Sequence, residues 1–415
     1  MSFGRQVFEF MIAGSRAYAR WDYDVSMSII RNRKKLMLLA LLALPLFLLS
    51  FAEAADVLGG KSAYAPAFYS SKVFIISIAV GMAAGLITGC IGAGGGFIIT
   101  PALMAAGVKG ILAVGTDLFH IFAKAIMGTT VHKKLGNVSG KLAVAFLAGS
   151  AGGTFIGGAI NVGLYNMNPL LSEVFISSIY ALLLGFLGFY ALHDFLTTVK
   201  KRDGGDVHGA PSAMTPLAGR LQAVNLPPMI NFDQDMVPGG RHISGWIVAA
   251  GGMVVGILAA IMGVGGGFVT FPMFVYVFGI SSMTTVGTDI LQIIFTAGIA
   301  AITQYAIYGF VFYTLAMGML IGSLIGIQIG ALTTKVVKGI HIRGFYAVSI
   351  LAGFVNRAAT LPKKMVELGV VSLPMQLVVG IEFFGTILFW VVVAVFGIWV
   401  TGKFVTNIGK LRAEG

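Results

Sequence analysis

Two glycine-rich stretches decide how this chain folds. Residues 92–97 are Gly-Ala-Gly-Gly-Gly-Phe, and residues 263–268 are Gly-Val-Gly-Gly-Gly-Phe. Each interrupts an apolar run, at 73–106 and at 244–278. Both runs are too long for one straight membrane crossing, because about 20 residues rising 1.5 Å each span the hydrocarbon core. A glycine costs about 1 kcal/mol in a helix interior, so we predict that both runs are hairpins broken at their glycines.

The composition places the chain in a membrane. Of 415 residues, 57% are hydrophobic and 11% are charged, against roughly 25% charged residues in soluble domains. The formal net charge is +12. The charged residues lie between apolar runs of membrane-spanning length rather than in one basic patch, which favours a lipid bilayer and not nucleic acid as partner. One cysteine and six histidines without metal-ligand spacing exclude a disulfide framework and predict neither a metal nor a cofactor.

Ten apolar segments are predicted to enter the membrane. They are 36–52, 73–106, 114–131, 142–162, 173–195, 244–278, 283–307, 310–334, 342–356 and 374–400. Arginine and lysine precede the first segment, fill the loop between the halves and flank the last segments. By the positive-inside rule, both termini and that loop are expected in the cytoplasm.

This orientation divides the chain into five parts. They are a cytoplasmic N-terminal segment with the first transmembrane helix and an external loop (1–72), repeat 1 (73–195), a cytoplasmic loop (196–243), repeat 2 (244–402) and a cytoplasmic tail (403–415). Within the loop, 203–242 is rich in glycine, proline and polar residues, so we expect mobile chain there. The sequence leaves open whether the first apolar segment is a cleaved signal peptide.

The two halves are copies of each other. Besides the glycine breaks, Pro101 matches Pro272, and Val-Gly-Thr-Asp at 114–117 matches 286–289. Because one copy is expected to start outside and the other inside, the repeats are inverted, as in many secondary transporters that bind substrate between repeats. The predicted fold is an all-α polytopic membrane protein with inverted repeats. Each repeat is a Gly-broken helical hairpin followed by three transmembrane helices, and an N-terminal transmembrane helix precedes them.

Other glycines have a packing pattern. Glycine recurs at every fourth position in two segments, and this spacing predicts close helix packing. These residues are Gly149, Gly153 and Gly157, and Gly318, Gly322 and Gly326.

Polar side chains follow each glycine break at helical spacing. Asp117, His120 and Lys124 share one face of a predicted helix, and their counterparts are Asp289, Gln292 and Thr296. An ionisable residue inside a membrane is a functional candidate by default. For Lys124 we predict anion binding, with a structural ion pair to Asp117 as the alternative. The two aspartates are candidates for helix capping or proton coupling.

Unwound glycines expose backbone amides, and the helix that follows directs its positive end at them, so the breaks are candidate anion sites. The candidate substrate-binding residues are Gly92, Gly94, Gly95, Gly96, His120, Lys124, Gly263, Gly265, Gly266, Gly267, Gln292 and Thr296. Near the ends of the last two segments, Arg357 and Glu382 are expected to pair with each other.

Together these motifs resemble the TauE/SafE sulfite exporter family, also called the four-toluene sulfonate uptake permease group. The similarity covers 77–400. It rests on the paired breaks, each followed by a proline, on Val-Gly-Thr-Asp-Leu at 114–118, on Lys124 and on His132-x-x-x-Gly-Asn-Val. Many members have serine where this chain has aspartate at 117 and 289, so a family role for that hydroxyl does not transfer. The resemblance implies transport of sulfite, thiosulfate or organosulfonates, usually outward across the bacterial cytoplasmic membrane.

We therefore expect an alternating-access exporter of a small sulfur oxyanion or sulfonate, and not an enzyme. Its expected location is the bacterial inner membrane, and a homodimer is the candidate assembly. Lys124 is the expected counter-charge, and His120, Gln292 and Thr296 are the expected hydrogen-bond donors. One alternative is an intramembrane aspartyl protease using Asp117 and Asp289. Another is a carrier or channel coupled to cations or protons.

Overall fold

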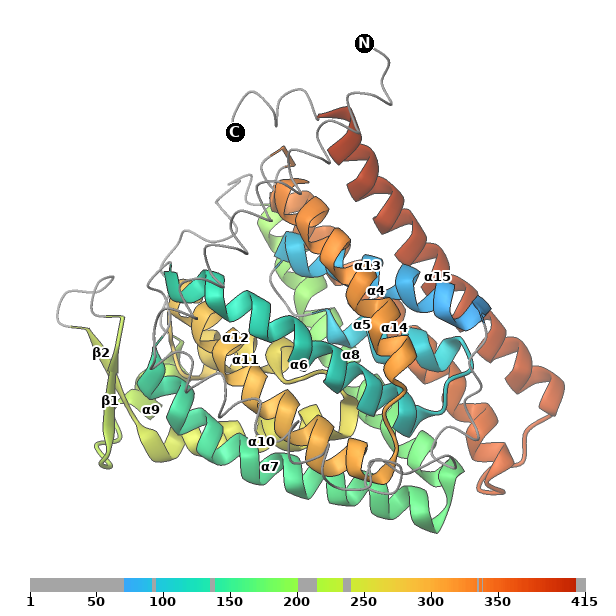
Figure 1. Ribbon diagram of the computed structural model, residues 1–415, viewed down its shortest axis with the longest axis horizontal. Coiled ribbons are helices and arrows are strands. Elements are labelled where there is room, and N and C mark those ends of the chain that lie inside the picture. The colour runs from blue at the N-terminus through green and yellow to red at the C-terminus, as the bar shows by residue number, and fades with distance from the viewer. Residues whose placement is uncertain are drawn as a thin grey trace. The chain divides into compact units, whose positions relative to one another are not determined.

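The computed structural model describes residues 71–91, 95–134, 139–200, 215–233, 240–333, 336–337 and 339–407. The predicted N-terminal helix at 36–52 lies outside these residues. The described chain is almost entirely helical (Figure 1), which confirms the all-α prediction.

The first half contains five helices in the order that the repeat predicts. They are α4 (Ser71–Ile91), α5 (Gly96–Ala105), α6 (Gly110–Lys134), α7 (Gly140–Met167) and α8 (Pro169–Lys200). The second half repeats this order with short distorted turns. Its helices are α10 (Gly245–Met262), α11 (Gly267–Pro272), η1 (Met273–Val277), α12 (Ser282–Ile299), η2 (Ala300–Tyr305), η3 (Ala306–Tyr308), α13 (Tyr313–Thr333) and α14 (Gly339–Glu367). A further helix, α15 (Met375–Thr406), ends the predicted repeat 2 and is one more than a broken hairpin followed by three helices requires.

Seven described helices are long and apolar enough to cross a membrane. They cover Gly140–Met167, Pro169–Thr197, Gly245–Met262, Gly287–Tyr308, Tyr313–Gly330, Ile340–Glu367 and Met375–Thr406. Large apolar side chains such as Leu182, Phe186 and Ile398 are more than 70% exposed. Water does not favour so many exposed apolar side chains, whereas lipid does. The chain is thus a multi-pass membrane protein.

Both predicted glycine breaks are confirmed. The first long apolar run is divided between α4 and α5, and the second between α10 and α11. Gly95, Gly263, Gly265 and Gly266 have φ of 69°, 80°, 65° and 95°. A residue with a Cβ adopts this conformation only at a cost, so the glycines allow the chain to leave one helix and start the next within a few residues.

The two halves interlock. Helix α4 of the first half packs along α13 of the second, and α10 of the second packs along α7 of the first (Figure 1). The remaining central pairs join equivalent helices, α6 with α12 and α8 with α14. A two-fold relation produces this pattern, because each contact then occurs again with the partners exchanged. It supports the predicted repeat. The inverted orientation across the bilayer stays a prediction.

Glycines allow the interlocking helices to touch. A Cβ on Gly85 of α4 would lie 2.6 Å from the Ser323 carbonyl oxygen and 2.8 Å from its Cα. The equivalent Gly256 of α10 lies against the Ser150 backbone. The predicted packing glycines lie on the partner side of the same contacts, in α7 and α13, and that prediction is confirmed.

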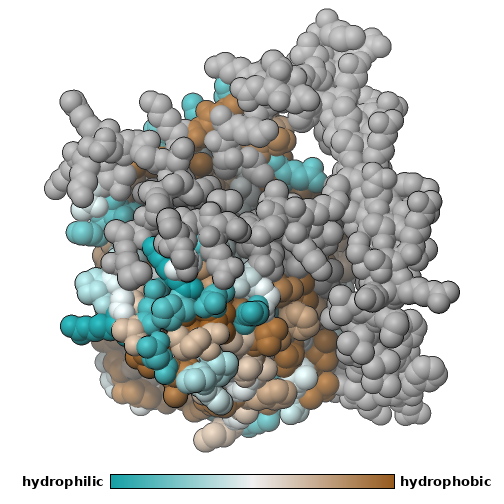
Figure 2. Space-filling view, turned by 90° about the vertical axis from the view of Figure 1, so that its left-hand side faces the viewer, coloured by the Kyte–Doolittle hydropathy of each residue, from teal (hydrophilic) through white to brown (hydrophobic). Residues whose placement is uncertain are grey.

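The expectation of mobile chain at 203–242 is wrong where the structure describes it. This part contains α9 (Pro216–Gln222) and a two-stranded antiparallel sheet of β1 (Met229–Phe232) and β2 (Arg241–Ser244), in which Met229 pairs with Ser244. Figure 2 shows hydrophilic side chains gathered on this face, where Arg220, Asn231 and His242 are exposed.

We call the segment of α9, β1 and β2 the cap. Side-chain contacts hold it on the second broken hairpin. Asp233 accepts hydrogen bonds from the Ser281 amide (2.8 Å), the Ser281 hydroxyl (2.6 Å) and the Thr284 hydroxyl (2.6 Å) at the start of α12. Arg241 donates to the Gly279 carbonyl. Composition alone failed here because these partners lie far away in the sequence.

Candidate functional site

The first cluster of buried polar side chains centres on Asp117, in the interior of α6. The Thr100 hydroxyl, on α5, donates to Asp117 Oδ2 at 3.0 Å. Both side chains are fully buried. Because α5 begins directly after the first glycine break, this bond connects the break to α6.

His120 extends the cluster toward the second half. Its Nε2 lies 2.8 Å from the Ser323 hydroxyl on α13, and Ser323 donates to the Gly81 carbonyl on α4. Its Nδ1 lies 3.6 Å from Asp117 Oδ1. These two atoms are buried without a hydrogen-bond partner among the described residues. Unpaired polar atoms are costly in a dry interior, so this pair is a candidate place for a proton or another ligand.

Lys124 lies beside the first glycine break. Its ammonium donates to the Thr88 hydroxyl on α4 at 3.4 Å, and a Cβ on Gly95 would lie 2.8 Å from that hydroxyl. The Lys124 side chain is 9% exposed and is also within electrostatic range of Asp117. The structure therefore brings together Lys124, Gly95 and His120, as the sequence predicts.

The second half has its own polar cluster at equivalent positions. Gln292 donates to Asp289 Oδ1 at 2.8 Å and accepts from the Thr296 hydroxyl at 2.7 Å. Thr296 also lies 2.8 Å from the Ser150 hydroxyl on α7, as His120 does from Ser323. Thr270 of α11 contacts Gln292 at 3.3 Å, so each cluster joins its own broken hairpin to the other half.

The two glycine breaks meet between the clusters. Phe97 and Phe268, which end the two motifs, stack with centroids 4.8 Å apart and planes 24° apart. A Cβ on Gly96 would lie 3.0 Å from the Val264 Cα, and one on Gly265 would lie 2.6 Å from Ile121. An anion can therefore enter between the breaks only if they separate.

The candidate residues accordingly form two sets rather than one. His120 and Lys124 belong to the first cluster with Gly95, and Gln292 and Thr296 belong to the second, whereas Gly96 faces Ile121 and Val264. Gly266 and Gly267 adjoin the second cluster, since a Cβ there would lie 3.7 Å from Gln292 and 3.1 Å from Asp289. Gly263 and Gly265 face α6 instead. Gly92 and Gly94 lie outside the described residues.

The helix-capping interpretation of the aspartates is wrong. Helix α6 begins at Gly110 and α12 at Ser282, so Asp117 and Asp289 lie two turns inside. Ser281 caps α12 by accepting from the Thr284 amide. The helices start earlier than the apolar pattern indicated because Gly110 and Ser282 directly follow the turns that end the broken hairpins.

The expected pair between Arg357 and Glu382 is also wrong. Glu382 pairs with Lys363 at 2.8 Å, which lies closer to the end of α14. Arg357 is buried and donates to Asn356 and Met104.

Sequence reasoning missed the hydroxyl groups that complete both clusters. They are Thr88, Thr100, Ser150, Thr270 and Ser323. A signal existed for two of them, because Gly-Ser occurs within both fourfold-spaced glycine stripes, at 149–150 and 322–323. Among the described residues no group of three or more His, Cys, Asp or Glu could hold a metal ion. The described side chains of the two clusters offer hydrogen-bonding groups, the ammonium of Lys124 and groups that can exchange protons.

Comparison with known proteins agrees with this arrangement. The profile of the family "Sulfite exporter TauE/SafE" matches residues 77–357. Two proteins of Bacillus subtilis (strain 168), the probable membrane transporter proteins YjnA and YunE, are each 24% identical to this chain. The matches cover 61% and 62% of this chain, and 87% of each relative.

A probable membrane transporter protein of Xylella fastidiosa (strain 9a5c) is also 24% identical, over 62% of this chain and 84% of its own. No solved structure matches the chain. The family match spans more than half of the chain and includes both glycine breaks and both polar clusters, and this multi-pass membrane transporter therefore belongs to the sulfite exporter TauE/SafE family.

Proposed function

We propose that the protein is a secondary transporter that carries a small sulfur oxyanion or organosulfonate outward by alternating access. The observation that carries the proposal is the buried Lys124 beside the first glycine break. A buried ammonium in a membrane requires a counter-charge. Asp117 is within electrostatic range of Lys124. An anion at the break would add charge-assisted hydrogen bonds to the ammonium, and the start of α5 directs the positive end of its dipole there.

The family description, which names sulfite export, supports the choice of a sulfur oxyanion. Sulfite and sulfonates present several acceptor oxygens, which match the ammonium of Lys124 and the imidazole of His120. In the second cluster, Gln292 and Thr296 are the proposed donors. Because the clusters are separate, we propose that the anion meets Lys124 first in one conformation and the second cluster in another.

The interlocked halves support alternating access. The two broken hairpins touch through Phe97 and Phe268, and a small separation there would open the space between Lys124 and Gln292. Carriers with repeats use such rocking of one half against the other around a central site.

The charge of the anion supports the proposed outward direction. The inside-negative potential drives a monoanion outward by about 2.3 kcal/mol per 100 mV. Export therefore needs no coupling ion, whereas uptake would. We place the protein in the bacterial cytoplasmic membrane with both termini inside.

A proton-coupled carrier is the second candidate, and a specific observation favours it. Asp117 Oδ1 and His120 Nδ1 face each other without a hydrogen bond, so one proton could move between them. Proton coupling predicts that an imposed pH gradient drives uptake of the anion. A potential-driven exporter predicts that the membrane potential drives flux of the anion and that a pH gradient alone does not. The aspartyl protease alternative is excluded because the family is one of transporters.

Flux through proteoliposomes tests the role of Lys124. Lys124→Gln keeps a polar, slightly shorter side chain and removes its charge, and Lys403→Gln at the exposed end of α15 is the matched control. Loss of one charge-assisted contact, about 1.5–3 kcal/mol, lowers sulfite or sulfoacetate flux roughly tenfold or more. The control keeps wild-type flux. Equal flux in wild-type protein and Lys124→Gln would contradict the proposal.

A further inference from the structure

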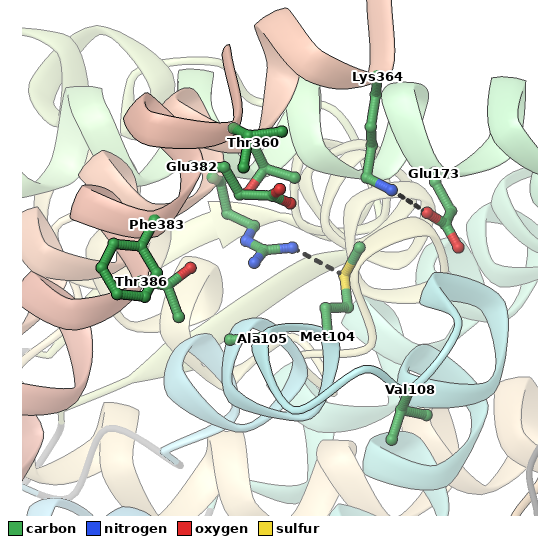
Figure 3. A pocket seen from close by; sticks show the side chains of 11 residues that line it. Met104, Ala105, Val108, Glu173, Thr360, Lys364, Glu382, Phe383 and Thr386 are labelled. Atoms are coloured by element: carbon green, nitrogen blue, oxygen red, sulfur yellow. Dashed lines mark hydrogen bonds and ion pairs between the residues drawn. The ribbon is translucent and has the colours of Figure 1, made fainter. Parts of the chain in front are cut away.

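A cavity with a volume of about 260 Å³ opens where α5 and α14 end and where α8 and α15 begin. Figure 3 shows Met104, Ala105 and Val108 on one side of it, with Lys364 and Glu173 opposite and Glu382 and Thr386 beside them. Its volume is below the roughly 300–1,000 Å³ of pockets for drug-sized ligands. It therefore suits a small molecule or ion.

Four charged side chains line the cavity, namely Glu173, Glu382, Lys364 and Arg357. Lys364 pairs with Glu173, and Lys363 pairs with Glu382. These pairs neutralise both carboxylates that line the cavity. Among the described residues, Arg357 is the cation of this cavity that forms no ion pair with a carboxylate, and the residue is 2% exposed.

The guanidinium of Arg357 is held in a fixed orientation by neutral groups. Its Nε and Nη2 donate to Asn356 Oδ1 at 2.8 and 2.5 Å, and Nη1 donates to the Met104 sulfur at 3.3 Å. Asn356 is held in turn by Thr386, to whose hydroxyl it donates at 3.4 Å. Two neutral acceptors, one of them a weak thioether, leave donors of the guanidinium available. A buried cation in this setting is stabilised by an anion that lies in the plane of the guanidinium, at the edge where its remaining N–H donors point.

We propose that this cavity is an oxyanion-binding site in which Arg357 is the counter-charge. The ligand is a small monoanion with at least two terminal oxygens, because the single guanidinium of Arg357 lacks a carboxylate partner among the described residues and a guanidinium binds such groups through two parallel hydrogen bonds. This chemistry is shared by a free sulfonate and by the phosphate of an anionic lipid. The site is separate from Lys124 and does not depend on that residue binding substrate.

The cavity also connects to the transport machinery. Met104 and Ala105 form the last turn of α5, and α5 starts at Gly96 in the first glycine break. An anion bound at Arg357 therefore contacts the same short helix whose other end adjoins Lys124. The equivalent end of the second broken hairpin is covered by the cap of α9, β1 and β2, since Thr215 donates to the Tyr276 carbonyl.

Calorimetric titration of the detergent-purified, full-length Lys124→Gln protein with methanesulfonate tests the site without contribution from the proposed transport site. Methanesulfonate binds, and adding Arg357→Gln weakens binding about tenfold or more, as expected for one lost charge-assisted contact. Arg357→Lys retains the charge but loses the two-pronged geometry, so its affinity lies between the two. Equal affinity with and without Arg357→Gln would overturn the proposal. Unchanged flux in Lys124→Gln alone would instead count against the transport proposal only.

A second variant protects the test against misfolding of Arg357→Gln. Ala105 lines the cavity without bonding to Arg357, so Ala105→Leu fills space and excludes the ligand. Ala151→Leu, at a half-buried position of α7 away from the cavity, is the control. Methanesulfonate binding is lost in Ala105→Leu and kept in Ala151→Leu; binding kept in both contradicts the site.

Lipid competition separates the two sources of the oxyanion. Mixed micelles with phosphatidylglycerol reduce Arg357-dependent methanesulfonate binding if a lipid phosphate occupies the cavity, whereas phosphatidylcholine micelles serve as the neutral control. No competition by phosphatidylglycerol assigns the cavity to a free anion. Absence of any Arg357-dependent binding of methanesulfonate and phosphatidylglycerol rejects the site for both sources.

Discussion

At the residue scale, three buried polar side chains of α6 and α12 hydrogen-bond to hydroxyl groups of other helices. Asp117 accepts a hydrogen bond from the Thr100 hydroxyl. His120 shares a hydrogen bond with Ser323, and Thr296 shares one with Ser150. The membrane core offers no water to complete such bonds, so each side chain must find a partner in the protein. These bonds fix the orientation of the candidate site.

The bond from Thr100 to Asp117 is predicted to stabilise the fold. Thr100→Val has nearly the same shape but leaves the buried Asp117 carboxyl without a donor, which costs about 1–3 kcal/mol. The midpoint of thermal unfolding in detergent measures this loss.

Thr154→Val is the matched control for Thr100→Val. Thr154 is also fully buried, but its hydroxyl donates only to the Ala151 carbonyl of its own helix. Its loss is expected to cost less than about 1 kcal/mol. Equal midpoints for the two variants would show that the Asp117 bond contributes little.

At the scale of elements, glycine determines which helices pair. Gly81 and Gly85 let α4 contact the backbone of α13, and Gly252 and Gly256 do the same for α10 on α7. Close backbone approach replaces the hydrophobic effect, which does not drive helices together within lipid.

Gly85→Ala tests this contact. The added methyl would overlap the Ser323 backbone, and overpacking of this kind costs typically about 1–3 kcal/mol. The Gly85→Ala protein is therefore expected to unfold at a lower temperature than wild type.

Gly163→Ala in α7 has no heavy atom within 4 Å of the new methyl. It should stabilise α7 slightly, by roughly 0.5–1 kcal/mol, because alanine loses less entropy in a helix. A Gly85→Ala protein as stable as Gly163→Ala would argue against tight packing of α4 on α13.

At the scale of the whole molecule, neither half can form its contacts alone. Helices α4 and α7 of the first half pack on α13 and α10 of the second. The pairs α6 with α12 and α8 with α14 also join the halves. The two polar clusters follow the same rule, since Ser323 completes the first and Ser150 the second.

Cutting the chain between Gly205 and Asp206 tests this interdependence. The two halves, expressed together, are expected to associate and to purify as one complex through a tag on either half. A half expressed alone is expected to aggregate. In the first half, for example, the glycine-lined faces of α4 and α7 would lack partners. A monodisperse, stable first half on gel filtration would contradict the interlocked arrangement.

The sequence by itself determined the membrane class, the two breaks, the repeated element order and the family. These features depend on local properties, namely apolar length, the cost of consecutive glycines and the matched motifs around Asp117 and Asp289. It also placed Lys124 and His120 on one face, because helical spacing is a local rule.

Only the tertiary structure decided which side chains meet. It paired Glu382 with Lys363 instead of Arg357, added Ser150 and Ser323 to the clusters, and showed that the two aspartates lie inside helices rather than at their starts. It also ordered the cap of α9, β1 and β2 through Asp233. Each of these contacts joins residues far apart in the chain, and their partners depend on how the two halves interlock, which no local pattern specifies.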